Sequence, residues 1–174
     1  MVLAQGLFDD TQIQPTQLQK AIVIAAMTRL EIHPKQIWQF YSGMGKSYIV
    51  AAIALIASIT NKYSNTTIVV PNSFLKSRDH TKFAALFTNH PNVQYTDSLQ
   101  FEVQAKHLVL VDEADEILYK KPEQFFAIGA AKNKIANKAA RPKIVCFTST
   151  KGHDNELWHT LLQIQGYKEL SYWL

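Results

Sequence analysis

Residues 40–48, Phe-Tyr-Ser-Gly-Met-Gly-Lys-Ser-Tyr, contain the triplet Gly45, Lys46 and Ser47, a combination suited to binding phosphate. The triplet closes the phosphate-loop pattern G-x-x-x-x-G-K-[ST], although Phe40 stands where that pattern has its first glycine. The backbone N–H groups of such a loop, and the start of the helix after it, attract an anion. We expect Lys46 to reach the β- and γ-phosphates of a nucleotide and Ser47 to bind Mg²⁺. For this segment alone, a glycine turn that merely caps a helix remains an open alternative.

A second candidate site lies at Asp112 and Glu113, which directly follow the apolar run 108–111. We expect Asp112 to hold Mg²⁺ through water, and Glu113 to orient or deprotonate an attacking water. Acidic residues also stabilise helix N-termini, which would explain carboxylates in general but not a consecutive pair ending a hydrophobic strand. Lys46 and Glu113 are therefore the predicted catalytic residues, and Ser47 and Asp112 the predicted metal ligands.

Strand-like and helix-like apolar patterns alternate along the chain. Strands are predicted at 35–41, 65–71, 92–96, 106–115 (with an acidic end), 143–150 and 167–173, and helices at 17–30, 46–60, 74–87, 123–140 and 155–165. Such alternation predicts an α/β fold with a parallel sheet covered on both faces, where ligands bind at the carboxyl ends of the strands. The strand 143–150 is expected between the strands that precede Lys46 and Asp112. The hydroxyl groups of Thr148–Thr150 would then face the γ-phosphate, with a capped strand-end turn as the alternative.

With these motifs the chain resembles the first RecA-like domain of superfamily 2 helicases and translocases. Residues 112–115 read Asp-Glu-Ala-Asp, and Thr148–Thr150 stand where DEAD-box proteins have Ser-Ala-Thr. Residues 15–19, Pro-Thr-Gln-Leu-Gln, are similar to the Q motif of those proteins, and the resemblance gives Gln19 the role of reading the adenine edge. It implies a three-layer RecA-like P-loop fold with a mostly parallel central sheet, and ATP and Mg²⁺ as cofactors.

A closer resemblance is to SecA, the motor of protein translocation. Residues 40–47 match the SecA-like loop Met-Arg-Thr-Gly-Glu-Gly-Lys-Thr in register, including a large apolar residue at its first position. Residues 72–79 match Asn-Asp-Tyr-Leu-x-x-Arg-Asp at Asn72, Leu75, Arg78 and Asp79, and residues 111–118 match Val-Asp-Glu-x-Asp-x-Ile-Leu at every fixed position. Three features depart from SecA. The preprotein-binding insertion after the acidic motif is missing, Met44 replaces the loop glutamate, and no second RecA-like domain supplies an arginine finger.

We therefore expect residues 1–174 to form one ATP-binding domain, with the second motor domain absent. The domain would bind ATP or ADP and hydrolyse ATP slowly unless a second RecA-like domain or a protein partner completes the site. The predicted nucleotide contacts are Gln19, Ser42, Gly43, Met44, Gly45, Lys46, Ser47 and Tyr48. The resemblance implies that ATP is coupled to translocation or remodelling of a polypeptide. Two alternatives stay open: a nucleotide-gated or structural interaction module without turnover, and an RNA or DNA helicase domain.

Composition is that of an ordinary globular domain, with 47% hydrophobic and 18% charged residues in 174. A net charge of +4 without a long basic run gives little support to nucleic acid as a partner.

The single cysteine, Cys146, and the lack of a recognisable leader or membrane span favour the cytoplasm. The six histidines show no metal-ligand spacing. Arg78 has two open interpretations: a helix salt bridge, which is the plainer one, and a position facing the polymer track, as in related motors. The tryptophans are expected in core or subunit contacts: Trp38, Trp158 and Trp173.

Overall fold

The computed structural model of the protein describes residues 15–40, 43–130, 135–149, 162–163 and 165–171. Its strands are β1 (Lys35–Gln39), β2 (Asn65–Val69), β3 (Val93–Thr96), β4 (His107–Val111), β5 (Lys143–Thr148) and β6 (Lys168–Ser171). Its helices are α2 (Gln17–Arg29), α3 (Lys46–Ile59), α4 (Ser73–Phe87), α5 (Ala114–Lys120) and α6 (Pro122–Ala130), and a 3₁₀ turn spans Lys138–Ala140.

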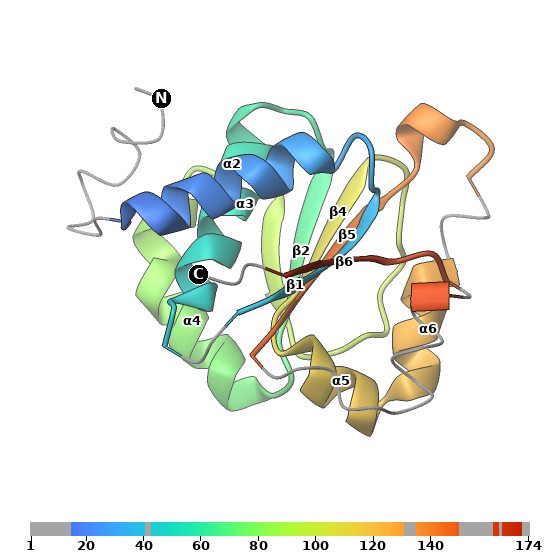
Figure 1. Ribbon diagram of the computed structural model, residues 1–174. Helices are drawn as coiled ribbons and strands as arrows, with labels where there is room; N and C mark the ends of the chain where they lie inside the picture. The colour runs from blue at the N-terminus through green and yellow to red at the C-terminus, as the bar shows by residue number, and fades with distance from the viewer. Residues whose placement is uncertain (1–14, 41–42, 131–134, 150–161, 164, 172–174) are drawn as a thin grey trace.

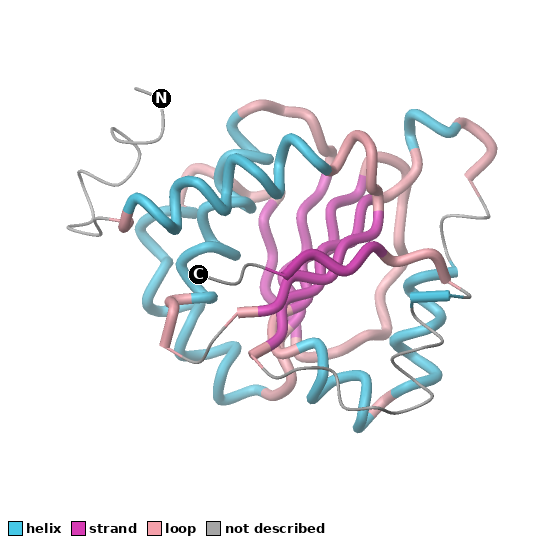
Figure 2. Tube along the Cα trace, viewed as in Figure 1, coloured by secondary structure: helices cyan, strands magenta, loops and turns pink. Residues whose placement is uncertain are grey.

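The six strands form one sheet in the order β3-β2-β4-β5-β1-β6, and every pairing is parallel (Figures 1 and 2). This confirms the predicted α/β class and the predicted place of β5 between β1 and β4. Since all the strands run the same way, the carboxyl ends of β1, β4 and β5 meet at one edge. The phosphate loop follows the end of β1, the acidic pair follows the end of β4, and Thr148 is the last residue of β5.

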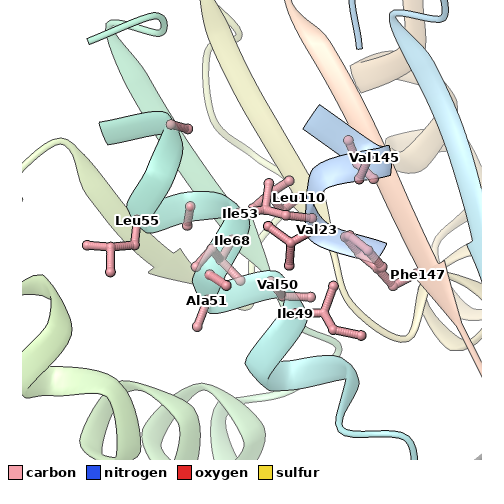
Figure 3. Packing of buried hydrophobic residues seen from close by; sticks show 14 of the residues in the cluster. Val23, Ile49, Val50, Ala51, Ile53, Leu55, Ile68, Leu110, Val145 and Phe147 are labelled. Carbon is pink, nitrogen blue, oxygen red and sulfur yellow. The ribbon is translucent and has the colours of Figure 1, made fainter. Parts of the chain in front are cut away.

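Helices cover the sheet on both faces, which gives three layers (Figure 1). One face carries α2, α3 and α4, and α3 is apolar around most of its circumference, as expected for a buried helix. Figure 3 shows Ile49 and Ile53 of α3 packed with Ile68 and Leu110 from β2 and β4. Full burial of each such side chain contributes about 1.5–3 kcal/mol, which fixes the helix that begins at Lys46.

The opposite face is covered by α5, α6 and an irregular segment, residues 97–106, around a second core with Val109, Ile144 and Cys146. The helix predicted at 123–140 is wrong in extent, because residues 135–137 are not helical and a short 3₁₀ turn follows them. There the Asn137 side chain accepts a hydrogen bond from the backbone N–H of Ala139, a local bond that competes with an α-helix. Of the helix predicted at 155–165, only residues 162–163 are described as helical, and residues 155–161 and 164 lie outside the described residues.

Candidate nucleotide site

The loop before α3 has the backbone that its glycines permit. Gly43 has φ 86° and Gly45 has φ 76°, both in the left-handed region that residues with a side chain rarely adopt. Gly45 is also the N-cap of α3 and has no side chain with which to bond the first-turn N–H groups. A Cβ at Gly45 would overlap the side-chain amide of Gln19, which would have to move away. Ser42 lies outside the described residues.

Phe40, which replaces the first glycine of the pattern, is a core residue. It is 2% exposed and lies stacked between two other rings, 6.4 Å from Trp38 and 6.1 Å from Phe147 between centroids. Its backbone N–H donates to the carbonyl of Thr148 at 2.9 Å, which extends the β1–β5 ladder up to the loop. Packing in the core therefore explains why a large apolar residue, Phe40, stands at the position of the first glycine of the pattern. The β1–β5 ladder continues as far as Phe40, and the phosphate loop begins after it. Trp38 is buried, as predicted.

Gln19 braces the phosphate loop from α2. Its Oε1 accepts from the backbone N–H of Thr16 at 2.9 Å, and its Nε2 donates to the carbonyl of Met44 at 3.0 Å. The backbone N–H of Gln19 donates to the Thr16 hydroxyl, which completes a capping box at the start of α2. The sequence placed Gln19 at the adenine edge, and the structure shows it holding the loop, so contact with adenine stays a prediction.

Lys46 and Glu113, the two predicted catalytic residues, are brought together. The Lys46 Nζ lies 2.6 Å from the Glu113 Oε1, and the hydroxyl of Ser149 donates to the Glu113 Oε2 at 3.1 Å. The side chains of Lys46 and Glu113 are only 10% and 30% exposed. Both carboxylate oxygens of Glu113 are therefore engaged, one by the loop after β1 and one by the turn after β5. Glu113 itself has φ 49°, a left-handed backbone that is uncommon for a residue with a side chain.

Asp112 is a buried carboxylate beside this ion pair. It is 5% exposed, and its Oδ1 accepts from the backbone N–H of Glu113 at 3.0 Å. Burial raises the pKa of Asp112 from its usual 3.8 to about 6; the charge of Lys46 opposes the rise and that of Glu113 adds to it. A buried carboxylate that is costly to ionise is suited to a cation, whose charge would offset the desolvation.

The described residues fit Mg²⁺ better than a metal held entirely by protein. Within the described ranges, no three His, Cys, Asp or Glu side chains gather as a metal-binding group. Mg²⁺ is usually held by one or two carboxylates together with substrate phosphates and several waters, which matches one buried Asp112 and one hydroxyl from Ser47. The predicted ligands Ser47 and Asp112 are thus sufficient in kind and number for Mg²⁺ with a nucleotide.

Arg78 belongs to this region, for which the sequence left a helix salt bridge and a position facing the polymer track as alternatives. That bridge exists, with Arg78 Nε 2.7 Å from the Oδ1 of Asp79, whose side chain is 3% exposed. The Nη2 of Arg78 also lies 3.5 Å from the Ser47 Oγ. The hydrogen bond to Asp79 raises the pKa of Arg78 above its ordinary value, and Asp112 and Glu113 add to the rise. The adjacent residues Arg78 and Asp79 were the signal in the sequence that could have placed Arg78 here. A buried carboxylate such as Asp79 needs a cation held in a fixed position beside it.

Tyr48, the last predicted nucleotide contact, packs between α3 and α4. Its ring meets Phe83 edge-on at 5.4 Å, and the ammonium of Lys82 lies 3.9 Å from its ring centroid. Contact of the side chain with nucleotide stays a prediction. Trp158, Trp173 and Thr150 lie outside the described residues. Among the helices of the described ranges, none is both long and apolar enough to cross a bilayer.

Comparison with known proteins gives similarity of structure alone. No protein-family model matches the sequence, and no curated protein does. The yeast DEAD-box splicing factor Prp28 is similar with a TM-score of 0.69 and 16% identity, over 97% of this chain and 48% of that one. The Hef helicase domain of Pyrococcus furiosus has a TM-score of 0.66 and 16% identity, over 94% and 39%. The UvsW helicase of bacteriophage T4 has a TM-score of 0.65 and 15% identity, over 92% and 61%.

This chain thus spans between 39% and 61% of the length of those three structures. At such low identity the similarity establishes the fold and not the activity. The chain has the three-layer RecA-like α/β fold of superfamily 2 helicase domains.

Proposed function

We propose that this chain binds ATP with Mg²⁺ and hydrolyses it as one of the two RecA-like units of a motor. The observation that carries the proposal is the meeting of Lys46, Glu113 and Ser149, which come from the ends of three neighbouring strands. A glycine turn that only capped a helix would give no reason for a lysine, two carboxylates and a hydroxyl to converge beside it. Asp112 and Ser47 would hold the metal, which would neutralise charge on the phosphates.

The geometry suggests what the protein residues do when nucleotide arrives. The loop N–H groups and Lys46 bind the phosphates, so Lys46 exchanges its bond to Glu113 for bonds to phosphate. Glu113, released from Lys46, is then free to accept a proton from the attacking water. Ser149 keeps one oxygen of Glu113 fixed and so limits where the other can point. Arg78 lies near enough to the Ser47 hydroxyl to add positive charge at the same edge.

A second RecA-like domain, or a protein partner, is part of this proposal. An arginine finger supplied in trans is worth about 10³–10⁵ in rate, and the described part of the chain places no arginine other than Arg78 beside the site. We therefore expect slow turnover by this chain alone.

What the motor moves is a separate matter. Translocation or remodelling of a polypeptide follows from the SecA resemblance of the sequence. A nucleic-acid strand is the second candidate, and a structural feature favours it. Phe74, at the start of α4, is 74% exposed, and Tyr119 of α5 is 78% exposed. Both helices start at the edge that carries the site, and exposed aromatic rings are what the bases of single strands stack on.

Titration of labelled single-stranded RNA at two salt concentrations, into the wild type and Phe74→Ala, distinguishes the two candidates, since loss of a stacking ring weakens RNA binding alone.

Calorimetric titration with ADP, with and without Mg²⁺, tests nucleotide binding directly. Lys46→Ala should weaken ADP binding by at least about tenfold, because a charge-assisted contact to phosphate is worth about 1.5–3 kcal/mol. Lys62→Ala is the matched control, since Lys62 pairs with Glu31 on the surface. ADP binding that is absent in the wild type, or unchanged in Lys46→Ala, would contradict the proposal.

A further inference from the structure

A cavity of about 570 Å³ lies between residues 99–105 and α6. We call it the α6 cavity. Leu99 and residues 101–105 form one wall, and Ala127 and Ile128 of α6 with Ile135 form the other. None of these residues belongs to the nucleotide site. Small-molecule sites typically occupy about 300–1,000 Å³, and this volume falls within that range.

The first wall of the α6 cavity belongs to the irregular segment 97–106, which covers this face of the sheet together with α5 and α6. Phe101 and Val103 are half-buried against the second core, whereas Glu102 and Gln104 are exposed. The segment is anchored near its end, where the backbone N–H of Gln104 donates to His107 Nδ1 at 3.4 Å. The ring of Phe101 also lies 5.9 Å from the ring of His107. The side chain of His107, at the start of β4, therefore holds this wall of the cavity against the sheet.

The lining gives the chemistry of an occupant. Leu99, Phe101, Val103 and Ile128 offer aliphatic and aromatic surface, and Glu102 is the only charged residue of the described lining. An apolar body would fill the cavity, and a cation would meet the carboxylate of Glu102. Among the described lining residues, a phosphate or carboxylate ligand would meet no positive charge. Lys132 and Lys134 follow α6 outside the described residues, and the anionic probe below tests whether they reverse this preference.

We propose that the α6 cavity binds a small apolar molecule that carries an amine, at a site separate from the nucleotide. The site is independent of the proposed ATPase activity. Because its lining shares no residue with the nucleotide site, we expect ADP not to compete with the ligand.

Amide chemical-shift titrations with three probes of matched shape test the proposal: naphthylmethylamine, naphthylmethanol and naphthoate. The amine should saturate and shift the amides of residues 99–105 and of α6. It should bind about threefold tighter than the alcohol or more, the size expected of a partly exposed ion pair, and naphthoate should bind weakest. Glu102→Gln should remove the difference between amine and alcohol, while Glu123→Gln, an exposed acid on α6 away from the lining, should leave it unchanged.

Filling the cavity should abolish binding of all three probes. Ala127→Trp does this from α6 and Ala105→Trp from the opposite wall, so that one variant suffices if the other does not fold. Ala130→Trp, exposed on α6 and not part of the lining, is the control and should bind normally. The proposal is overturned if the wild type shows no saturable shifts, if the shifts map elsewhere, if naphthoate binds as tightly as the amine, or if either filled variant binds unchanged.

Discussion

Replacement of Glu113 by glutamine should make the protein bind ADP more tightly in the absence of Mg²⁺, while abolishing hydrolysis. In the structure the Lys46 Nζ lies 2.6 Å from the Glu113 Oε1, an ion pair. Phosphate can bind the Lys46 ammonium only if the bond to Glu113 breaks. The Glu113 carboxylate therefore competes with phosphate for Lys46 and lowers the affinity for ADP. Glutamine keeps the size of the side chain and a neutral acceptor, and removes the charge.

The size of the effect follows from the difference between two kinds of hydrogen bond. A bond to a charged partner contributes about 1.5–3 kcal/mol and a neutral one about 0.5–1.5 kcal/mol, a difference of about 1 kcal/mol. Solvent does not remove this difference, because the Lys46 side chain is only 10% exposed. Since 1.4 kcal/mol is tenfold, we expect ADP to bind about fivefold tighter to Glu113→Gln.

Calorimetric titration of ADP into both proteins in chelator measures this directly. Glu116→Gln is the matched control, because Glu116 also pairs with a lysine, Lys120, but on the exposed surface of α5. The control should bind ADP as the wild type does. An affinity of Glu113→Gln equal to or lower than that of the wild type would refute the view that the ion pair competes with phosphate.

Three further outcomes are expected. Asp112→Asn should raise the free energy of unfolding at pH 7 by up to about 3 kcal/mol, because a folded-state pKa raised from 3.8 to about 6 makes the ionised carboxylate a cost to the folded state above that range. The same change should weaken binding of Mg²⁺–ADP. Urea unfolding at pH 7 measures the first effect and Mg²⁺-dependent calorimetry the second. Phe40→Ala should lower the free energy of unfolding by about 3–5 kcal/mol in urea unfolding, because it leaves a cavity in the core. Phe40→Met is closer in volume and should lower it by less than about 1.5 kcal/mol. Equal losses in the two variants would contradict the packing argument. Burial lowers the pKa of His107 below its usual 6.5. As the pH falls, the unfolded chain therefore takes up this proton before the folded protein does, and the free energy of unfolding decreases below about pH 6.5. His107→Gln should lose less of its free energy of unfolding between pH 7.5 and pH 5, as urea unfolding at the two pH values measures.

The parts of the fold that the sequence predicts are those governed by local pattern. The apolar run after Ser47 could only be a buried helix, and the run 108–111 ending in two acids could only be a central strand, so α3 and β4 were predicted to within a few residues. The neighbours of β5 also followed, because the expected type of parallel sheet places that strand between the ones that precede Lys46 and Asp112. The extent of α6 was wrong, since nothing local in residues 131–140 shows where tertiary packing stops supporting a helix.

The candidate site was predictable in its residue types and not in its contacts. Lys46, Ser47, Asp112 and Glu113 were chosen because their chemistry suits phosphate and metal. The bond between Ser149 and Glu113, the left-handed backbone of Glu113 and the position of Arg78 near Ser47 depend on how separate strands and helices pack. The same holds for Gln19, whose partner Met44 is set by how α2 lies on α3.

The all-parallel sheet has a consequence for how this chain folds. Among the described strands no pair is a hairpin: Lys35 of β1 pairs with Ile144 of β5, and β4 joins β2 to β5 across long separations in sequence. Each pairing must close a large loop before it gains any contact, so the transition state must gather distant segments. Refolding should accordingly be slow for the chain length, and the edges of β2, β4 and β5 should be open to other molecules while it proceeds.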